Sequence, residues 1–268
     1  MVGNTVKKIL LFAFLGWSCA NHGTRPLVSG TSADDSPLAK RLLNEGYQVV
    51  WRDEFDGTAL DLTKWEYRQL GVVRNLGRVA KETIRLDGQG NLLIALQKVG
   101  NEYKIGQLGT EKFYKTTYGY FECRARMNHQ PGPHVAFWLQ TPTMGKIVGD
   151  PVRSGVEIDI FEYHRKEPAT IHHNLHWDGY GSDHKTAGKK TTVPAIETGF
   201  HTFGLLWTEK EYVFFVDNQE TWRTTTAVST AEEYLLLSLE LTGWGGDPAL
   251  AVLPDDVAYD YVRVYQKK

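Results

Sequence analysis

Apolar and polar residues alternate along several short runs of the chain, and the clearest run covers residues 118–127. Phe121 and Cys123 fall on one face of this run, and Glu122 falls on the other. A period of two is typical of a β-strand that buries one face against a core. The run therefore predicts a strand in which Cys123 packs in the core and does not act as a reactive thiol.

Other segments rich in β-branched and aromatic residues are separated by turn-forming residues. The strands that they predict cover residues 92–96, 203–207, 212–216, 235–241 and 260–265. Two of these segments flank the short polar turn 208–211 and so predict a β-hairpin. Many short strands with few helical patterns predict an all-β fold, an antiparallel β-sandwich of two sheets.

The composition supports this fold and excludes several classes of protein. Among 268 residues, 26 are Gly, 13 Tyr, 11 Phe and 8 Trp, which suits a protein of strands and turns. The net charge of −2 argues against a nucleic-acid-binding protein, which normally carries an excess of Lys and Arg. The 2 cysteines, Cys19 and Cys123, exclude a scaffold held together by several disulfides.

The N-terminal segment has the pattern of an export signal. Two lysines precede the apolar run 9–15, which is shorter than the roughly 20 apolar residues needed to span a bilayer. We therefore expect residues 1–18 to be a signal peptide and the protein to be exported. Cys19 follows a small residue and resembles the lipidation site of bacterial lipoproteins, which would place the protein at the cell surface. Ordinary cleavage at or beyond Ala20, giving a secreted or periplasmic protein, is the alternative.

The residues that follow predict a tether and one folded domain. Residues 21–37 are rich in Gly, Ser, Thr, Pro and Asp, and residues 37–43 have a short helical pattern. From Tyr47 onward the strand pattern continues to the C-terminus without another linker. We therefore expect a tether over 19–45 and a single domain over 46–268, in a monomeric protein.

Three carboxylates stand close together in the β-forming segment 155–164. On a regular strand Glu157 and Asp159 face the same way, whereas Glu162 faces the opposite side. One extra residue, a β-bulge near Ile160 and Phe161, would bring all three onto one face, where like charges raise one another's pKa values. Retaining glycosidases use two carboxyls about 5 to 5.5 Å apart, one as nucleophile and one as acid/base.

Spacing alone does not establish that chemistry. Glu157 and Glu162 would lie about 13 Å apart along a strand of ordinary rise, so strand curvature and side-chain convergence would have to bring them together. The simpler interpretation of the spacing is an acidic strand face exposed to solvent.

The acidic segment resembles the active-site motif of glycoside hydrolase family 16, in the form with two residues between the Asp and the second Glu. The resemblance covers residues 47–266, nearly the whole expected domain. Segments similar to other parts of the family lie at 51–57, 64–65, 118–122, 136–139, 200–203 and 260–265.

This resemblance implies a concanavalin-like jelly roll whose concave face binds a polysaccharide. It implies endo-hydrolysis of internal β-glycosidic bonds with retention, without a metal or an organic cofactor. By position in the motif, Glu157 would be the nucleophile and Glu162 the general acid/base. Asp159 would orient the nucleophile and control its protonation. Because the acid must hold a proton near neutral pH, we expect a raised pKa for Glu162 and an ionised Glu157.

Four further residues are candidates for binding the polysaccharide. The resemblance places Trp138 in the cleft, and alternation with Phe137 leaves a core position as the alternative. Trp65 and Arg68 resemble a pair that surrounds sulfated galactose in porphyran-cleaving members, and an Arg can bind sulfate through two hydrogen bonds. A solvated loop charge is the alternative for Arg68. Trp244 lies in a Gly-rich loop, where a Trp is better placed to line a groove than to fill a core.

A cluster of histidines, His172, His173 and His176, invites a metal interpretation. On a strand His172 and His176 share a face, and His173 points away. Without a nearby Cys or a helical H-E-x-x-H pattern, two histidines are weak support for zinc. We therefore expect no metal at this cluster and place His176 in the cleft. The family resemblance leaves a structural calcium site open, although no dense acidic loop in the sequence calls for one. The following loop, 178–184, has no assigned role.

Two other functions and several substrates stay open. A non-catalytic lectin on the same fold would have no need of three clustered acids, and a transglycosylase would use the same acids with a sugar as acceptor. Because loops select the polysaccharide, β-1,3-glucan and galactans such as agar or porphyran are all compatible with the sequence.

Overall fold

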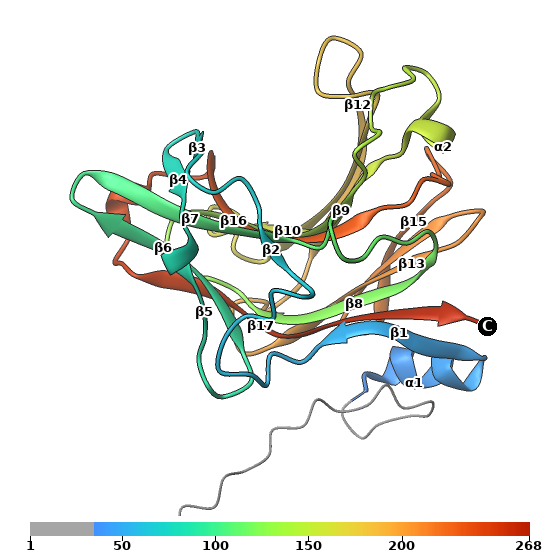
Figure 1. Ribbon diagram of the computed structural model, residues 1–268, viewed down its shortest axis with the longest axis horizontal. Coiled ribbons are helices and arrows are strands. Elements are labelled where there is room, and N and C mark those ends of the chain that lie inside the picture. The colour runs from blue at the N-terminus through green and yellow to red at the C-terminus, as the bar shows by residue number, and fades with distance from the viewer. Residues whose placement is uncertain (1–34) are drawn as a thin grey trace, which may run out of the picture.

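The strands of the computed structural model form two stacked layers, as the sequence predicted (Figure 1). The structure describes residues 35–268, so the expected signal peptide, Cys19 and most of the expected tether lie outside the described residues. Neighbouring strands pair antiparallel, except that β4 (Gly77–Val79) runs parallel to β7 (Glu102–Gly109). The prediction of an all-β antiparallel sandwich is confirmed.

We call the lower layer in Figure 1 the back layer and the upper one the front layer. The back layer contains β1 (Tyr47–Asp53), β5 (Ile84–Leu86), β6 (Leu92–Val99), β8 (Gly119–Arg126), β13 (His201–Trp207), β14 (Tyr212–Val216), β15 (Gln219–Thr224) and β17 (Asp255–Lys267). The front layer contains β2 (Glu66–Tyr67), β7, β9 (Gly132–Gln140), β10 (Glu157–His164), β11 (Thr170–Trp177), β12 (Lys185–Thr192) and β16 (Tyr234–Gly245).

The β6–β7 hairpin passes from one layer to the other. The first part of β6 pairs with β17 of the back layer, and residues 97–99 pair with β7 of the front layer. The short strands β3 (Val73–Arg74) and β4 extend this corner. The helical segments are α1 (Pro37–Asn44), α2 (Pro151–Ser154) and the 3₁₀ turns η1 (Lys81–Thr83) and η2 (Pro248–Leu250). Within residues 35–268, no helix has the length and apolar character needed to cross a membrane.

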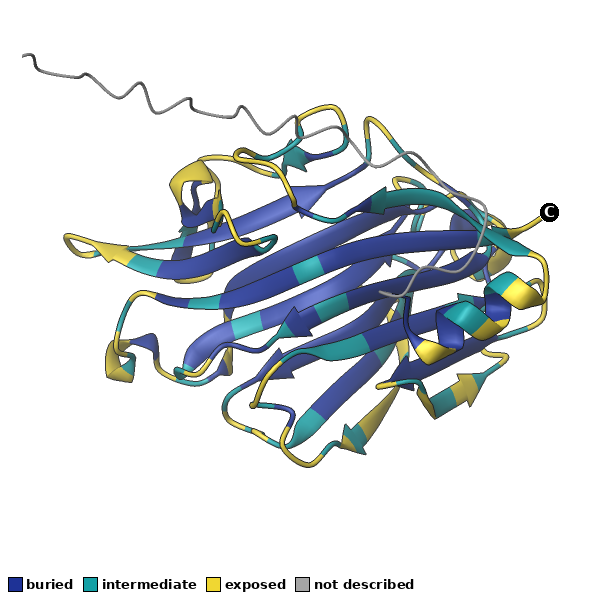
Figure 2. Ribbon diagram, turned by 90° about the horizontal axis from the view of Figure 1, so that it is seen from below, coloured by how far each residue is buried: buried dark blue, intermediate teal, exposed yellow. Residues whose placement is uncertain are grey.

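The core lies between the two layers and consists of the inward positions of their strands. Phe161 of β10 and Phe203 of β13 meet there with ring centroids 4.1 Å apart. Figure 2 shows that the strands are mostly buried and the loops exposed. Cys123 is fully buried, as predicted, and burial raises the pKa of its thiol well above the usual range.

The strand predictions are confirmed along the chain. The alternating run at 118–127 forms β8, and the predicted hairpin is β13–β14, with Phe203 opposite Val216. The remaining predicted segments lie in β6, β16 and β17. The periodic pattern therefore located the strands, although it did not show how they pair.

Helix α1 covers part of the outer face of the back layer. Its N-cap is Ser36, whose side chain accepts a hydrogen bond from the backbone of Ala39, and Pro37 occupies the first turn. Leu38 and Leu42 are buried in a cluster that includes Tyr120 and Tyr265. Residues 35–44, which the sequence pattern assigned to the tether, thus pack against the domain.

This covering helix changes the environment of Glu122. The period-two pattern put Glu122 on a polar face, yet the residue is fully buried. Its carboxyl accepts hydrogen bonds from the hydroxyls of Ser36 at 2.6 Å, Tyr120 at 2.6 Å and Tyr261 at 2.9 Å. Burial raises the pKa of Glu122, and these hydrogen bonds oppose the rise. A strand pattern could not show this burial, because the cover comes from a distant segment.

Replacing Ser36 by Ala should destabilise the protein. The change removes the cap of α1 and one hydrogen bond to the buried Glu122, so we expect a loss of about 1 to 3 kcal/mol in the free energy of unfolding. Urea denaturation measures the loss. The exposed Ser182→Ala is the matched control and should change stability by less than about 0.5 kcal/mol. An equal, small effect of both changes would contradict the proposed anchoring of α1.

Candidate active site

A cleft runs over the outer face of the front layer. Its lining residues are Arg68, Gln69, Arg74, His134, Ala136, Trp138, Gln140, Glu157, Asp159, Glu162, Tyr180, Ser238, Glu240 and Thr242. Strand alternation explains the contribution of β9: its even-numbered residues from His134 to Gln140 line the cleft, and Val135, Phe137 and Leu139 are fully buried in the core. This alternation places Trp138 in the cleft.

An irregularity in β10 brings the three acids together. Asp159 lies opposite Trp138 of β9, but Phe161 lies opposite the next residue, Phe137, so Ile160 is the extra residue of a bulge. The pairing of β10 with β11 shifts over the same interval. The predicted bulge is confirmed, and Glu157, Asp159 and Glu162 all line the cleft.

The carboxyl of Glu157 is held by two donors. Gln140 donates from Nε2 to Oε2 of Glu157 at 3.0 Å, and the hydroxyl of Tyr180 donates to the same oxygen. Gln140 also bonds the Tyr180 hydroxyl at 2.7 Å, which fixes both donors relative to each other. Burial raises the pKa of Glu157 above its usual value, and the hydrogen bond from Tyr180 reduces this rise without cancelling it, so the structure does not favour the ionised Glu157 that the sequence led us to expect.

Asp159 is the most isolated of the three acids. It is buried, and the imidazole of His176 lies beside it, with Nε2 at 3.4 Å from Oδ2. Burial raises the pKa of Asp159 well above its usual range, and the charges of Glu162 and Glu157 raise it further. Asp159 is therefore the acid that holds a proton most firmly.

Glu162 has the strongest partners. His134 places Nε2 at 2.9 Å from Oε1, and Asn174 donates a hydrogen bond to Oε2. Burial alone would raise the pKa of Glu162, but the contacts with His134 and Asn174 outweigh burial and hold it below its usual value. The expectation of a raised pKa for Glu162 is wrong in this structure, because it counted the neighbouring acids and not the partners on β9 and β11.

Trp138 forms part of the floor of the cleft. Its indole Nε1 donates to Ser238 Oγ at 3.1 Å, which leaves the ring face toward the cleft. The guanidinium carbon of Arg68 lies 5.4 Å from the ring centroid. Arg68 also donates to Gln107 and Gln140, each at 3.2 Å. Arg68 is therefore a fixed cleft residue, and not a solvated loop charge.

Trp65 is not a cleft residue, and the expectation that it binds substrate is corrected. The side chain is fully buried, and its Nε1 donates to Asp53 Oδ2 at 2.8 Å. Its ring packs edge-on against Trp51 at 5.3 Å. The physical reason is that Asp53 supplies an acceptor for the indole inside the core, so the large ring can be buried without an unpaired N–H.

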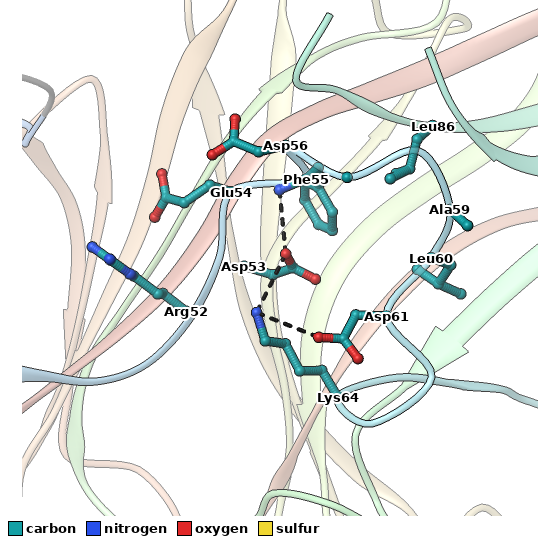
Figure 3. Close-up of a pocket in the computed structure, with 11 residues that line it drawn as sticks. Arg52, Asp53, Glu54, Phe55, Asp56, Ala59, Leu60, Asp61, Lys64 and Leu86 are labelled. Atoms are coloured by element: carbon teal, nitrogen blue, oxygen red, sulfur yellow. Dashed lines mark hydrogen bonds and ion pairs between the residues drawn. The ribbon is translucent and has the colours of Figure 1, made fainter. Parts of the chain in front are cut away.

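Asp53 also belongs to a second hollow, shown in Figure 3. Lys64 lies between Asp53 and Asp61, at 3.6 Å and 3.9 Å from their oxygens. The backbone N–H of Phe55 donates to Asp53 at 3.2 Å. These contacts stabilise the conformation of the loop after β1. The hollow and the cleft have no lining residue in common.

The remaining two candidates lie beside the acids. His176 neighbours Asp159 and also contacts His184, with Nδ1 and Nε2 2.9 Å apart. Trp244 is 37% exposed and packs on the rings of His134, His164 and His172, with centroids 4.9 to 5.2 Å away. Trp244 thus stands next to the partner of Glu162, at the edge of the cleft.

Four site residues were missed by sequence reasoning: His134, Gln140, Asn174 and Tyr180. Asn174 shared a face with His172 and His176 in the predicted strand, so its position carried a signal. His134 and Gln140 alternate with core residues of β9, and a period-two reading around Trp138 would have found them. Tyr180 lies in the loop after β11 and carried no such signal.

Two groups of side chains have the donors for a metal ion. One consists of Glu157, Asp159 and His176, and the other of His164, Glu167 and His172. Within each group the ligand atoms lie within 4.8 Å of one another. The first group is part of the acid cluster itself, and the second lies behind Trp244.

Comparison with known proteins identifies relatives of this domain. The family model of the glycosyl hydrolases family 16 matches residues 77–263. A protein of Rhizobium meliloti (strain 1021) named endo-1,3-1,4-beta-glycanase EglC is 32% identical over 168 residues, which cover 62% of this chain and 34% of EglC. The chain thus spans about a third of the length of that relative.

Two further relatives are matched over more of their length. The beta-glucanase of Rhodothermus marinus is 30% identical over 248 residues, which cover 82% of this chain and 85% of that protein. The crystal structure of a laminarinase from Flavobacterium sp. UMI-01 superposes with a TM-score of 0.70 at 30% identity, covering 82% of this chain and all of that chain (100%). The predicted jelly-roll sandwich and the predicted glycosidase class are therefore confirmed at the level of the family, and the chain belongs to the glycosyl hydrolases family 16.

Proposed function

We propose that this protein is a retaining endo-β-glycanase that cleaves internal bonds of a β-glucan containing 1,3-linkages. The observation that carries the proposal is the bulge at Ile160, which turns Glu157, Asp159 and Glu162 toward one cleft beside Trp138. The substrate class is supported by the relatives, which are named endo-1,3-1,4-beta-glycanase, beta-glucanase and laminarinase.

Glu157 is proposed as the nucleophile. Two donors, Gln140 and Tyr180, point at one of its oxygens and favour the charged form that attacks the anomeric carbon. Attack would break the glycosidic bond and form a covalent glycosyl-enzyme. A nucleophile held by donors from β9 and from the loop after β11 keeps one orientation throughout this step.

Glu162 is proposed as the general acid and, in the second step, the general base. As acid it would protonate the leaving glycosidic oxygen, and as base it would take a proton from the water that hydrolyses the intermediate. His134 and Asn174 favour its ionised form, so they help the second step and limit the first. His134 therefore sets the pH above which the acid has lost its proton.

Asp159 is proposed to hold a proton between the two glutamates. Its burial and its anionic neighbours favour the neutral acid. A neutral Asp159 keeps a third negative charge out of the cluster, so Glu157 can be ionised at a lower electrostatic cost. Asp159 would also move a proton within the cluster as the charge of Glu157 changes during the reaction.

Glu157→Gln and Glu162→Gln should each lower kcat by about 10²- to 10⁴-fold on a polysaccharide, because each removes one of the two reacting groups. Both proteins should remain folded by circular dichroism, since Gln keeps the volume of Glu. Glu220→Gln, on the exposed strand β15, is the control and should keep normal activity.

A second measurement separates the two roles. On an aryl glycoside with a good leaving group, Glu162→Gln should lose less activity in bond cleavage than Glu157→Gln, because that leaving group needs no proton. Azide added to Glu157→Ala should give an α-glycosyl azide, whereas azide added to Glu162→Ala should give the β-anomer. The opposite pair of products would reverse the assignment of nucleophile and acid.

Laminarin and lichenan should be hydrolysed to oligosaccharides of several lengths, as expected for cleavage at internal bonds. Agarose, porphyran and carrageenan serve as the comparison set. Product analysis by chromatography gives the pattern, and NMR of the first products gives their anomeric configuration, which should be β. Hydrolysis of the galactans without hydrolysis of the glucans would overturn the proposed substrate class.

His134→Phe should shift the alkaline limb of the pH profile of kcat/KM to higher pH. The hydrogen bond and charge of His134 lower the pKa of Glu162, so their removal raises this pKa and lets the acid keep its proton at higher pH. The exposed His129→Gln is the matched control and should leave the limb in place. An unchanged alkaline limb in His134→Phe would exclude His134 as the group that tunes the acid.

A further inference from the structure

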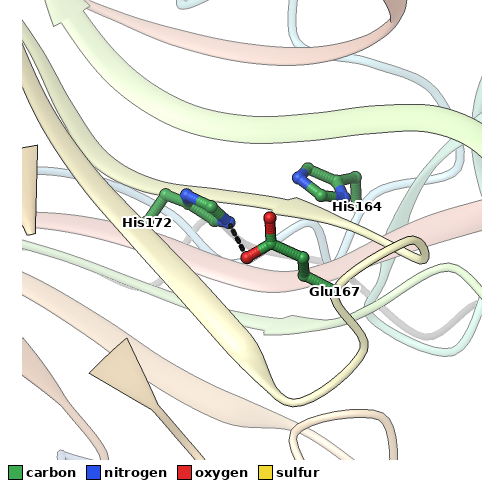
Figure 4. Close-up of side chains that lie close together, drawn as sticks. All are labelled: His164, Glu167 and His172. Atoms are coloured by element: carbon green, nitrogen blue, oxygen red, sulfur yellow. Dashed lines mark ion pairs between the residues drawn. The ribbon is translucent and has the colours of Figure 1, made fainter. Parts of the chain in front are cut away.

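Two histidines and a glutamate gather at the end of the β10–β11 hairpin, and His164 and His172 lie on the same face of the front layer as Glu162. His164 ends β10, His172 lies on β11, and Glu167 lies in the turn that joins the two strands. Figure 4 shows the three side chains converging, and their ligand atoms lie within 4.8 Å of one another. His172 Nε2 and Glu167 Oε2 are 3.5 Å apart.

The imidazoles of this cluster are buried, and three of their four ring nitrogens have no hydrogen-bond partner within residues 35–268. His164 is 1% exposed and His172 is 2% exposed. Among the residues that the structure describes, neither ring nitrogen of His164 has a hydrogen-bond partner, nor has Nε2 of His172. Buried polar atoms in proteins nearly always have a hydrogen-bond partner. Atoms without one call for an explanation, such as a bound ion. One ring nitrogen of each histidine lies within 4.8 Å of a carboxylate oxygen of Glu167.

The protonation states of these three side chains suit the binding of a metal ion, which accepts lone pairs from its ligands. Burial lowers the pKa of His164 to about 4, and it also lowers the pKa of His172, so both rings are neutral at pH 7. Glu167 is ionised, because the hydrogen bond from Lys190 lowers its pKa. Lys190 reaches both carboxylate oxygens from the solvent side, at 2.9 and 3.0 Å. Neutral imidazoles and an ionised carboxylate are the forms that bind metals.

We propose that His164, Glu167 and His172 bind one zinc ion. Two imidazoles and one carboxylate form a donor set that zinc takes in proteins, with water in the fourth position. At Zn–ligand distances of about 2.0 to 2.2 Å, tetrahedral ligand atoms lie roughly 3.4 Å apart, close to the separation of 3.5 Å between His172 and Glu167. Calcium and magnesium are disfavoured, because they prefer oxygen ligands.

The proposed ion would support Trp244, which lies next to the cleft residue His134. Trp244 packs on the rings of His164 and His172, with centroids 5.0 and 4.9 Å away, and also on His134. Zinc would fix both imidazoles and the turn that carries Glu167, so the indole would rest on a rigid support. His164, Glu167 and His172 are absent from the cleft lining, so the ion is a positioning element and takes no part in bond cleavage.

Zinc binding to the purified protein tests the proposal directly, and the readout does not depend on glycanase activity. The protein is stripped with a chelator, dialysed against ZnCl₂ and analysed for metal content, and its Tm is measured with and without Zn²⁺. We expect one zinc per chain and a higher Tm with Zn²⁺, but no rise with Ca²⁺. Cobalt in place of zinc should give the visible absorption of a tetrahedral ion. A protein that binds no zinc overturns the proposal.

Variants identify the site. Glu167→Gln changes a half-exposed turn residue and should fold normally, yet weaken zinc binding by at least about tenfold. His164→Gln and His172→Gln should abolish the bound zinc and the shift in Tm. His201→Gln, a partner of Asp217 on the protein surface, is the matched control and should bind zinc normally.

One further variant excludes the other cluster of donors. His176 lies with Glu157 and Asp159 in a second group that offers metal ligands. His176→Gln should keep one zinc per chain if the ion binds at the proposed site. Loss of zinc in His176→Gln, with retention in Glu167→Gln, would place the ion in the acid cluster and overturn the proposal.

Discussion

The single extra residue in β10 is the constraint on which the cleft depends. Without the bulge at Ile160, Glu162 would point between the two layers, where an ionised carboxylate is very costly to bury. With it, Ile160 and Phe161 are both fully buried, and the acid turns outward. The same local distortion therefore completes the core on one side of β10 and the acid cluster on the other.

The acid cluster is kept in place by neighbouring strands that differentiate its members. Glu157 receives donors from β9 and from the loop after β11, Glu162 from β9 and β11, and Asp159 has His176 beside it. Because each acid has different partners, three chemically similar groups hold their protons differently. The three acids bring like charges together in a buried site, which destabilises the fold. Burial of the apolar core beneath them offsets this destabilisation.

The alternation of apolar and polar residues predicted features that depend on a single strand. It failed for features that depend on contacts with a segment distant in the sequence. The strands and the burial of Cys123 follow from alternation within a run, whereas the bulge was expected from the resemblance of the acidic segment to the family motif. The burial of Trp65 depends on Asp53, and the pKa of Glu162 depends on His134, which is brought alongside by sheet pairing. A one-dimensional pattern holds no information on these partners, because register between strands is set by the whole fold.

The attachment of residues 35–44 has a consequence for how the domain meets a polymer. Asp35 is bound at 3.1 Å by Arg263 of β17, and α1 lies on the back layer, away from the front layer that carries the cleft (Figure 1). Asp35 therefore lies on the side of the domain remote from the acids. A polymer lying in the cleft would cross the front layer without contacting Asp35 or α1.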